Sequence, residues 1–373
     1  MKKVCLVTWS DSVNYGTCIQ CVALSKTLEK IGFEPYVLSN LRFYSHNEIR
    51  ELMSRVLRRL IEKIRAYYIE GEKRKYYKDR QKKNRLFVEE NTNTYFVKNN
   101  KAFYDMNNVM DYFVVGSDQL WNPYHLSLTM FLPFVYDSNK KISYATSVGV
   151  SRIPRRKRYL YEKYLNDFKF ISVREKTAQL LLNNLLDREI TRVVDPVFLL
   201  DKEEWMKLAA LSSNVEKSGD YFCYFIEKNK DYSAIKELAC VEGKKIKTCF
   251  SEYYSEDYSE DDDSLMLETG VEDFIGLIRC SDIIFTDSFH AICLSIIFEK
   301  QFVAFRRFEK DDKKSQNSRV EDLLKMFGLQ DRMYNGGNIE HITSSNIKYE
   351  IVNNILGKEK EKAISYLKES LGC

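Results

Sequence analysis

The sequence predicts an α/β protein made of two Rossmann-like domains with parallel sheets. Short apolar runs alternate with helical patterns over most of the chain, and this alternation favours parallel strands joined by right-handed crossovers. The 373 residues are enough for two or three domains with sizeable cores. Glycine (14 residues) and proline (5 residues) are too scarce for a collagen-like chain, a long flexible linker or a disordered scaffold.

The first domain is expected over residues 1–203. Its opening apolar run, Val4–Trp9, is typical of a buried strand, and Thr17–Ile31 places apolar residues on one face of a helix that Gly32 ends. Helices are also expected at Arg155–Asn166 and Glu175–Asn184. Further strands are predicted at Pro35–Leu38, Tyr112–Val115, Lys141–Ala145, Phe170–Val173 and Arg192–Val194.

The second domain is expected over residues 204–345, followed by a C-terminal helix within 346–373. The boundary is placed after Pro196 because an Asp-Pro step disfavours helix before it, and a new helix begins near Asp201. The predicted strands are Tyr221–Ile226, Lys247–Phe250, Asp282–Thr286 and Phe302–Phe305. The predicted helices are Tyr232–Val241, Val271–Cys280, His290–Phe298 and a final amphipathic helix at Lys348–Leu371.

Composition and charge exclude several classes of protein. The net charge of +4 is too small to indicate a nucleic-acid-binding protein. No apolar run reaches the ~18 residues of a membrane span, and Val4–Trp9 is too short for a signal peptide. The nine cysteines form no disulfide framework and the four histidines show no ligand spacing, so a cytoplasmic protein without a metal centre is expected.

A basic segment interrupts the alternation. Arg50–Phe87 contains 14 Lys and Arg against 5 Asp and Glu, within a helical insertion expected at about 46–90. One interpretation is a solvated helical pair. The other is a surface that makes peripheral contact with the anionic inner face of a membrane or with a pyrophosphate-linked lipid.

Polar residues follow several predicted strands, where ligands of doubly wound sheets bind against helix N-termini. Asn14 and Tyr15 lie in the loop that opens the first helix. In Gly116–Pro123, the carboxylate of Asp118, the amide of Gln119 and the indole of Trp121 form the mixture typical of carbohydrate sites. A turn with a buried tryptophan is the alternative interpretation.

Charged residues and one histidine follow later strands. Arg174 is expected either to pair with Glu175 or Asp195, or to bind an anion in the cleft. His290 lies at a predicted helix N-terminus, directly after a strand, which makes it a candidate general acid. Arg306 and Arg319 supply further cations on the same rim.

Seven segments in order resemble the polysaccharide pyruvyl transferase family over about residues 1–335. The segments are Asn14–Gly16, Val115–Asn122, Ile142–Ser147, Ile171–Glu175, Asp195–Leu200, Thr286–His290 and Ser318–Leu324. The resemblance implies a GT-B-like fold, with two Rossmann-like domains facing a central cleft. It also implies that pyruvate passes from phosphoenolpyruvate to a sugar diol of a capsule or exopolysaccharide precursor, giving a cyclic ketal and phosphate without a cofactor.

The resemblance also implies roles for individual residues. His290 would be the catalytic acid, and the donor-binding residues would be Arg174, Ser288, Arg306 and Arg319. The acceptor, a glycan or lipid-linked oligosaccharide, would contact Asn14, Tyr15, Asp118, Gln119 and Trp121. Several members have an arginine two positions before the histidine, where this chain has Ser288. A replacement cation is therefore expected from Arg306 or Arg319.

Two other functions fit the same fold. A glycosyltransferase with a nucleotide-sugar donor would need a carboxylate to bind the ribose. In the Asp-Ser-Phe-His segment Asp287 could do so, but little else there suits a base and a ribose. A non-catalytic glycan-binding protein would bind the acceptor without the donor. The acceptor sugar, the stereochemistry of the ketal and the oligomeric state are not encoded in recognisable residues.

Overall fold

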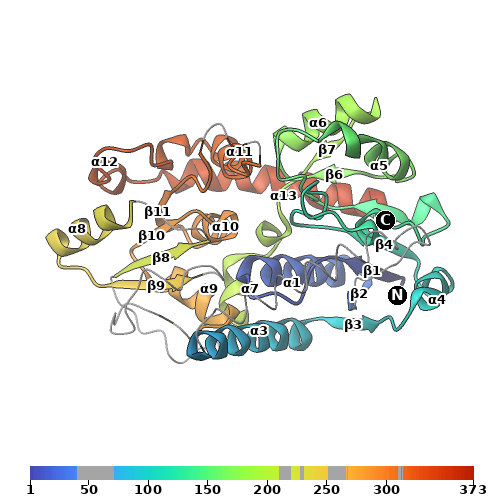
Figure 1. The fold of residues 1–373 in the computed structure, drawn as a ribbon, viewed down its shortest axis with the longest axis horizontal. Helices are drawn as coiled ribbons and strands as arrows, with labels where there is room; N and C mark the ends of the chain where they lie inside the picture. Colours follow the sequence, from blue (N-terminus) through green and yellow to red (C-terminus); the bar gives the residue numbers. More distant parts are fainter. Residues whose placement is uncertain are drawn as a thin grey trace.

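The computed structural model describes residues 1–39, 71–209, 220–226, 231–250, 266, 268–309, 312 and 314–373. Residues 46–70 of the basic insertion predicted at about 46–90 lie outside the described residues. Two parallel sheets form the two halves of the molecule, with helices packed around each (Figure 1). The α/β class and the two-sheet organisation predicted from the sequence are confirmed.

The first sheet has the order β3-β2-β1-β4-β5, and all its strands run parallel. A short parallel pair, β6-β7, continues it beyond β5 through bridges from Ile142 to Phe170 and from Thr146 to Val173. The strands are β1 (Lys3–Val7), β2 (Glu34–Ser39), β3 (Asn93–Phe96), β4 (Tyr112–Val115), β5 (Lys141–Ser143), β6 (Ser172–Val173) and β7 (Thr191–Arg192).

The second sheet has the order β11-β10-β8-β9, again with all strands parallel. Its strands are β8 (Tyr221–Phe225), β9 (Ile246–Phe250), β10 (Ile283–Thr286) and β11 (Gln301–Ala304). The helices of the two halves are α1 (Tyr15–Lys30), α3 (Gly71–Asn91), α4 (Asn100–Asp105), α5 (Arg155–Leu165), α6 (Lys176–Leu186), α7 (Lys202–Leu208), α8 (Tyr232–Glu242), α9 (Val271–Cys280), α10 (Phe289–Ile297), α11 (Ser318–Phe327), α12 (Glu340–Thr343) and α13 (Tyr349–Leu371).

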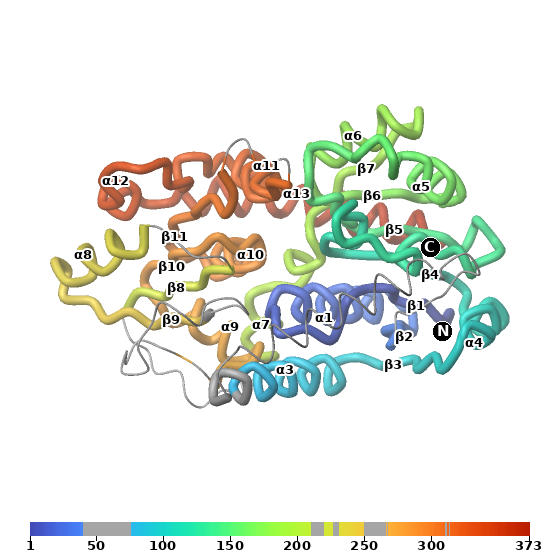
Figure 2. Tube along the Cα trace, in the orientation of Figure 1, coloured from blue at the N-terminus to red at the C-terminus, as the bar shows by residue number. Residues whose placement is uncertain are grey.

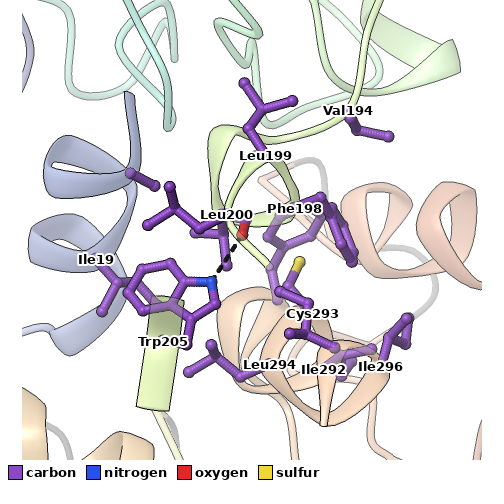
Figure 3. Packing of buried hydrophobic residues seen from close by; sticks show 14 of the residues in the cluster. Ile19, Val194, Phe198, Leu199, Leu200, Trp205, Ile292, Cys293, Leu294 and Ile296 are labelled. Carbon is purple, nitrogen blue, oxygen red and sulfur yellow. Dashed lines mark hydrogen bonds between the residues drawn. The ribbon is translucent and has the colours of Figure 1, made fainter. Parts of the chain in front are cut away.

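One apolar core joins the two sheets. Successive residues of a strand point to opposite faces, so Leu6 of β1 and Phe222 of β8 enter the shared core while their neighbours enter cores private to each half. Helices α1 and α10 fill this core together with the segment that connects the two sheets, residues 193–208, which includes α7 (Figure 3). Trp205 of that segment is fully buried there and donates its indole N–H to the carbonyl of Val197 at 3.0 Å.

Helix α13 and helix α3 lie across both halves. The hydroxyl of Tyr349, at the start of α13, donates to the carbonyl of Lys300 in the second half, and that of Tyr366 donates to the carbonyl of Ser143 in the first. Helix α3 contacts α1 and α9 along the lower side of the molecule (Figure 2). The predicted boundary at residue 203 falls inside α7, which begins at Lys202.

Two differences from the predicted elements have clear physical causes. Strand β3 was not predicted because this edge strand is mostly exposed and has no apolar run. The predicted strand Lys141–Ala145 ends early, at Ser143, because Ala145 turns into the left-handed region with φ of 50°. Within the described residues, no helix is both long enough and apolar enough to cross a membrane.

Candidate active site

The candidate site lies where the carboxyl ends of the two sheets meet. Arg174 directly follows β6, and His290 is the second residue of α10, directly after β10. Both are buried, with 3% and 5% of their surface exposed. The Nη1 atom of Arg174 lies 3.4 Å from Nε2 of His290. The sequence placed these residues after strands of different domains, and the fold brings them into contact.

Arg174 is held by carboxylates on several sides. Its Nη1 donates to Oδ2 of Asp195 at 2.7 Å, and its Nη2 donates to Oδ1 of Asp118 at 3.2 Å. Its Nε lies 3.7 Å from Glu175 Oε2, and its guanidinium stacks 4.1 Å from the ring centre of Phe289. Burial lowers the pKa of Arg174, but the carboxylates outweigh burial and raise it above its ordinary value.

Asp195 links the arginine to the histidine. Its Oδ2 lies 3.7 Å from Nε2 of His290 and 2.9 Å from the hydroxyl of Ser117, while its Oδ1 accepts from the main-chain N–H of Val197. Burial alone would raise the pKa of Asp195. His290 and Arg174 outweigh burial and hold this pKa well below its usual range. The sequence offered Asp195 only as a partner of Arg174, so its contact with the histidine is new.

The loop after β4 carries Asp118 into the cluster. Asp118 has φ of 70°, and the amide of Gln20 from α1 holds the turn by accepting from the N–H of Ser117 at 2.9 Å. Burial acts to raise the pKa of Asp118, but Arg174, His290 and Arg319 outweigh it and lower this pKa below its ordinary value. The lowered pKa favours the carboxylate form, whose two oxygens can accept hydrogen bonds from hydroxyls.

The first turn of α1 packs against the histidine. Asn14 caps α1 by accepting from the N–H of Gly16 at 2.9 Å. A methyl group built on Gly16 would lie 2.1 Å from Nδ1 of His290, so only glycine fits there without movement of the ring. This contact between the first and second halves could not be predicted from the sequence because it joins residues far apart in the chain.

Two of the predicted acceptor residues have fully buried rings. Trp121 is fully buried, donates to the carbonyl of Met130 at 2.9 Å and packs against Phe131. Tyr15 is also fully buried and stacks on Phe274 of the second half. Trp121 is thus covered within the first half and Tyr15 between the two halves, and their contact with an acceptor stays a prediction.

The remaining predicted residues lie around the cluster. Ser288 caps α10 by accepting from the N–H of Ala291 at 3.4 Å. Arg306 is exposed on the rim, where its Nε donates to Glu321 at 2.9 Å. Gln119 bridges the halves, with its amide 2.8 Å from that of Gln316. Arg306 is thus separate from the buried cluster, whereas Gln119 borders it.

A small cavity lies beside the cluster, with a volume of about 10 Å³, room for roughly one water molecule. Arg174 and Asp195 line it from the first half, and Phe289 and Arg319 from the second. Among the described residues, no three side chains of the types His, Cys, Asp and Glu are grouped to hold a metal ion.

Two Rossmann-like halves with a charged cluster at the carboxyl ends of both sheets define a protein of the GT-B-like class. The fold is similar to that of UDP-GlcNAc 2-epimerase from Neisseria meningitidis bound to UDP-GlcNAc, with 12% identity, 99% of this chain and 100% of that chain covered, and a TM-score of 0.51. It is also similar to the glycotransferase of kitacinnamycin, with 9% identity, 99% and 97% covered, and a TM-score of 0.50.

The family model for polysaccharide pyruvyl transferase matches residues 14–307. The chain belongs to the polysaccharide pyruvyl transferase family and is a transferase. A comparison with curated proteins finds no match. The similarity to the solved structures concerns the fold alone.

Proposed function

We propose that this chain transfers pyruvate from phosphoenolpyruvate to two hydroxyls of a sugar in a surface-glycan precursor, with His290 as the general acid. The observation that carries the proposal is the buried cluster in which His290 meets Arg174, Asp195 and Asp118. It combines a titratable group, cations for an anionic donor and a carboxylate for hydroxyls. Membership of the family supports pyruvyl transfer in general.

The proposed reaction begins with proton delivery to the methylene carbon of the donor. The proton is proposed to come from Nε2, the ring nitrogen on the side of Arg174 and Asp195 at 3.4 and 3.7 Å, because Nδ1 faces Gly16 of α1. Protonation creates an oxocarbenium-like carbon, which one sugar hydroxyl attacks. Phosphate then leaves with the bridging oxygen, and the second hydroxyl closes the ketal. One hydroxyl proton returns to the histidine and the other leaves with the phosphate.

Asp118 is proposed to accept from the attacking hydroxyls, since its Oδ2 already accepts from one hydroxyl, that of Thr17 at 3.4 Å. Asn14, which caps α1 next to the glycine that faces His290, and Gln119, the neighbour of Asp118, are proposed to contact the acceptor as well. The 10 Å³ cavity is too small for either substrate. Substrate entry therefore requires the halves to separate where Gln119 meets Gln316 and where the N–H of Thr177 meets Asp322.

A peripheral contact with the membrane is part of the proposal, because a lipid-linked acceptor would present its sugar near the surface. The exposed side chains of Lys78 and Lys82 on α3 provide cations for anionic headgroups. The remainder of the predicted basic segment, residues 50–70, lies outside the described residues.

The test is ketal formation in D₂O. Wild-type enzyme is incubated with phosphoenolpyruvate and a panel of galactose, mannose and N-acetylhexosamine acceptors, free and lipid-linked. The proposal predicts equimolar phosphate and a ketal methyl group that carries solvent deuterium, because the acid exchanges its proton with solvent. His290→Gln is expected to lose turnover by about 10²-fold or more. Wild-type turnover by His290→Gln, or transfer from a nucleotide sugar instead, contradicts the proposal.

A further inference from the structure

Glu175 is a buried carboxylate that the proposed reaction does not use. It directly follows Arg174 and precedes the first residue of α6, and 2% of its surface is exposed. Burial raises the pKa of Glu175 above its ordinary value, although Arg174 acts against burial. A buried carboxylate is costly unless hydrogen bonds replace its contacts with water, so the partners of Glu175 indicate what it does.

One oxygen of Glu175 holds the turn at residues 147–149. Its Oε1 accepts from the hydroxyl of Ser147 at 2.7 Å. The same oxygen accepts from the main-chain N–H groups of Val148 and Gly149, each at 3.1 Å. Donors from three consecutive residues thus converge on a single carboxylate oxygen.

The turn is joined to the loop after β4, residues 116–123, which we call the acceptor loop. The N–H of Ser147 donates to the carbonyl of Asp118 at 2.8 Å. Gly149 lies against Gln119, since a methyl group built on Gly149 would lie 2.3 Å from Oε1 of Gln119. The place of the turn therefore determines the place of the main chain of Asp118 and of the side chain of Gln119.

A second interpretation of Glu175 is charge compensation of Arg174. Within the described part of the chain, Oε2 of Glu175 has no hydrogen-bond partner, and it lies 3.7 Å from Nε of Arg174. Asp195 and Asp118, in contrast, accept hydrogen bonds from Arg174 at 2.7 and 3.2 Å. Arg174 is therefore compensated directly by two other carboxylates, which favours the turn as the main partner of Glu175.

We propose that Glu175 is a positioning residue for the acceptor, because it holds Asp118 and Gln119 in place through the turn at 147–149. The inference rests on the proposed function, which assigns the sugar to these two residues. Glu175 acts through the turn and is assigned no contact with either substrate. A misplacement of about 1 Å in groups that orient a substrate can cost roughly 10²-fold in rate.

The experiment measures ketal formation by Glu175→Ala and Glu175→Gln, with the acceptor of the panel that wild type converts. Glu175→Ala removes the oxygen that holds the turn, so its KM for the sugar is expected to rise about tenfold or more. Its affinity for phosphoenolpyruvate, measured by calorimetry, should stay within about threefold of wild type. Glu175→Gln keeps an amide oxygen for the three donors and should restore the KM to within about threefold of wild type.

Asn107→Ala is the matched structural control. The side chain of Asn107 also makes three hydrogen bonds to main-chain groups, namely the carbonyls of Tyr104 and Phe134 and the N–H of Tyr136, at 2.8, 2.9 and 3.0 Å. These residues precede β4 and β5 and so lie at the amino edge of the sheet, away from the acceptor loop. Asn107→Ala should lower the Tm and leave the KM for the sugar unchanged.

Hydrogen exchange measured by mass spectrometry gives a readout that does not depend on activity. The N–H groups of Val148 and Gly149 are bonded to a buried carboxylate, so they should exchange slowly in wild type. Glu175→Ala is expected to speed exchange about tenfold or more in peptides that cover the turn and the acceptor loop. Glu175→Gln and Asn107→Ala should leave the exchange of these peptides close to that of wild type.

Several results overturn the inference. One is a wild-type KM for the sugar, or unchanged exchange of the turn, in Glu175→Ala. Another is an equal rise of KM in Asn107→Ala, which would show a general loss of stability. A third is a Glu175→Gln enzyme as impaired as Glu175→Ala, which would assign Glu175 to the charge of Arg174.

Circular dichroism and thermal unfolding establish that the variants fold. If Glu175→Ala does not fold, Ser147→Ala removes one of the three donors to Glu175 and is expected to raise the KM and the exchange of the turn severalfold. Wild-type values of both in Ser147→Ala then overturn the inference.

The outcomes separate this inference from the proposed function. Ketal formation by wild type, with an unchanged KM in Glu175→Ala, removes the inference and leaves the function. If wild type forms no ketal, the proposed function fails, whereas faster exchange in Glu175→Ala still supports Glu175 as the residue that holds the loop.

Discussion

Replacement of Gly16 by alanine tests the contact between the first helix and the histidine. A methyl group there would lie 2.1 Å from Nδ1, 2.7 Å from Cγ and 3.0 Å from Cβ of His290. Ordinary contacts begin at 3.4 Å, so the ring must withdraw by about 1.3 Å, the difference between these distances. The ring is buried, and Nε2 already lies 3.4 Å from Nη1 of Arg174, which leaves little space for that movement.

Two consequences are expected. Displacement of a catalytic group by about 1 Å costs roughly 10²-fold in rate, so kcat of Gly16→Ala should fall by about that factor. Overpacking of a buried site should also lower the free energy of unfolding by about 1–3 kcal/mol. The assay is phosphate release from phosphoenolpyruvate with the active acceptor, together with thermal unfolding.

Gly357→Ala is the matched control. Gly357 lies in α13, and a methyl group there would have no neighbour within 4 Å. This substitution should raise stability by up to about 1 kcal/mol, since alanine favours helix, and it should leave kcat unchanged. A Gly16→Ala enzyme with wild-type kcat would refute the reasoning, because the histidine could then move without loss of function.

Three further predictions concern the contact between the two halves, the charge cluster around Arg174 and the membrane. Asp322→Ala removes a carboxylate that caps α6 from the other half by accepting from the N–H of Thr177 at 2.8 Å. The free energy of unfolding should fall by about 0.5–2 kcal/mol, which thermal unfolding measures, and an unchanged Tm would contradict this. The pKa of Asp195 is lower in the folded protein than in the unfolded chain, where it is near 4. Asp195 therefore stabilises the fold above about pH 4, and this stabilisation is lost as the pH falls towards the folded-state pKa. Asp195→Asn should therefore show a flatter decline of stability between about pH 5 and 2 than wild type, and an identical decline would argue against the charge cluster. The double substitution Lys78→Glu and Lys82→Glu should weaken binding to anionic vesicles, measured by sedimentation, about tenfold or more. If wild type sediments equally well with neutral and with anionic vesicles, the electrostatic explanation is wrong.

The sequence predicted the elements best where burial imposes a regular pattern. The strand Tyr112–Val115 and the helix Val271–Cys280 have the predicted bounds, because both carry uninterrupted apolar signals between clear breaks. The exposed edge strand β3 gave no such signal. The predicted strand Lys141–Ala145 is too long at its end, since the main-chain N–H of Ala145 donates to the hydroxyl of Ser172 at 3.1 Å instead of to a neighbouring strand.

The candidate site could be predicted in part for a topological reason. Asp118, Arg174 and His290 all follow parallel strands, so each lies at the carboxyl edge of the sheet in its own half. Residue type alone could not distinguish an indole that stacks on a sugar from Trp121 packed against Phe131. The contact between Asp195 and His290 depends on how the two halves meet, which no local pattern encodes.

Binding of phosphoenolpyruvate by calorimetry tests the central claim most directly. Wild type should bind phosphoenolpyruvate, and Arg174→Ala should lose that binding because the cluster that shapes the donor site loses its central cation. A nucleotide sugar titrated in parallel should give no heat of binding. Binding of the nucleotide sugar without binding of phosphoenolpyruvate would contradict the proposed donor and leave only the fold.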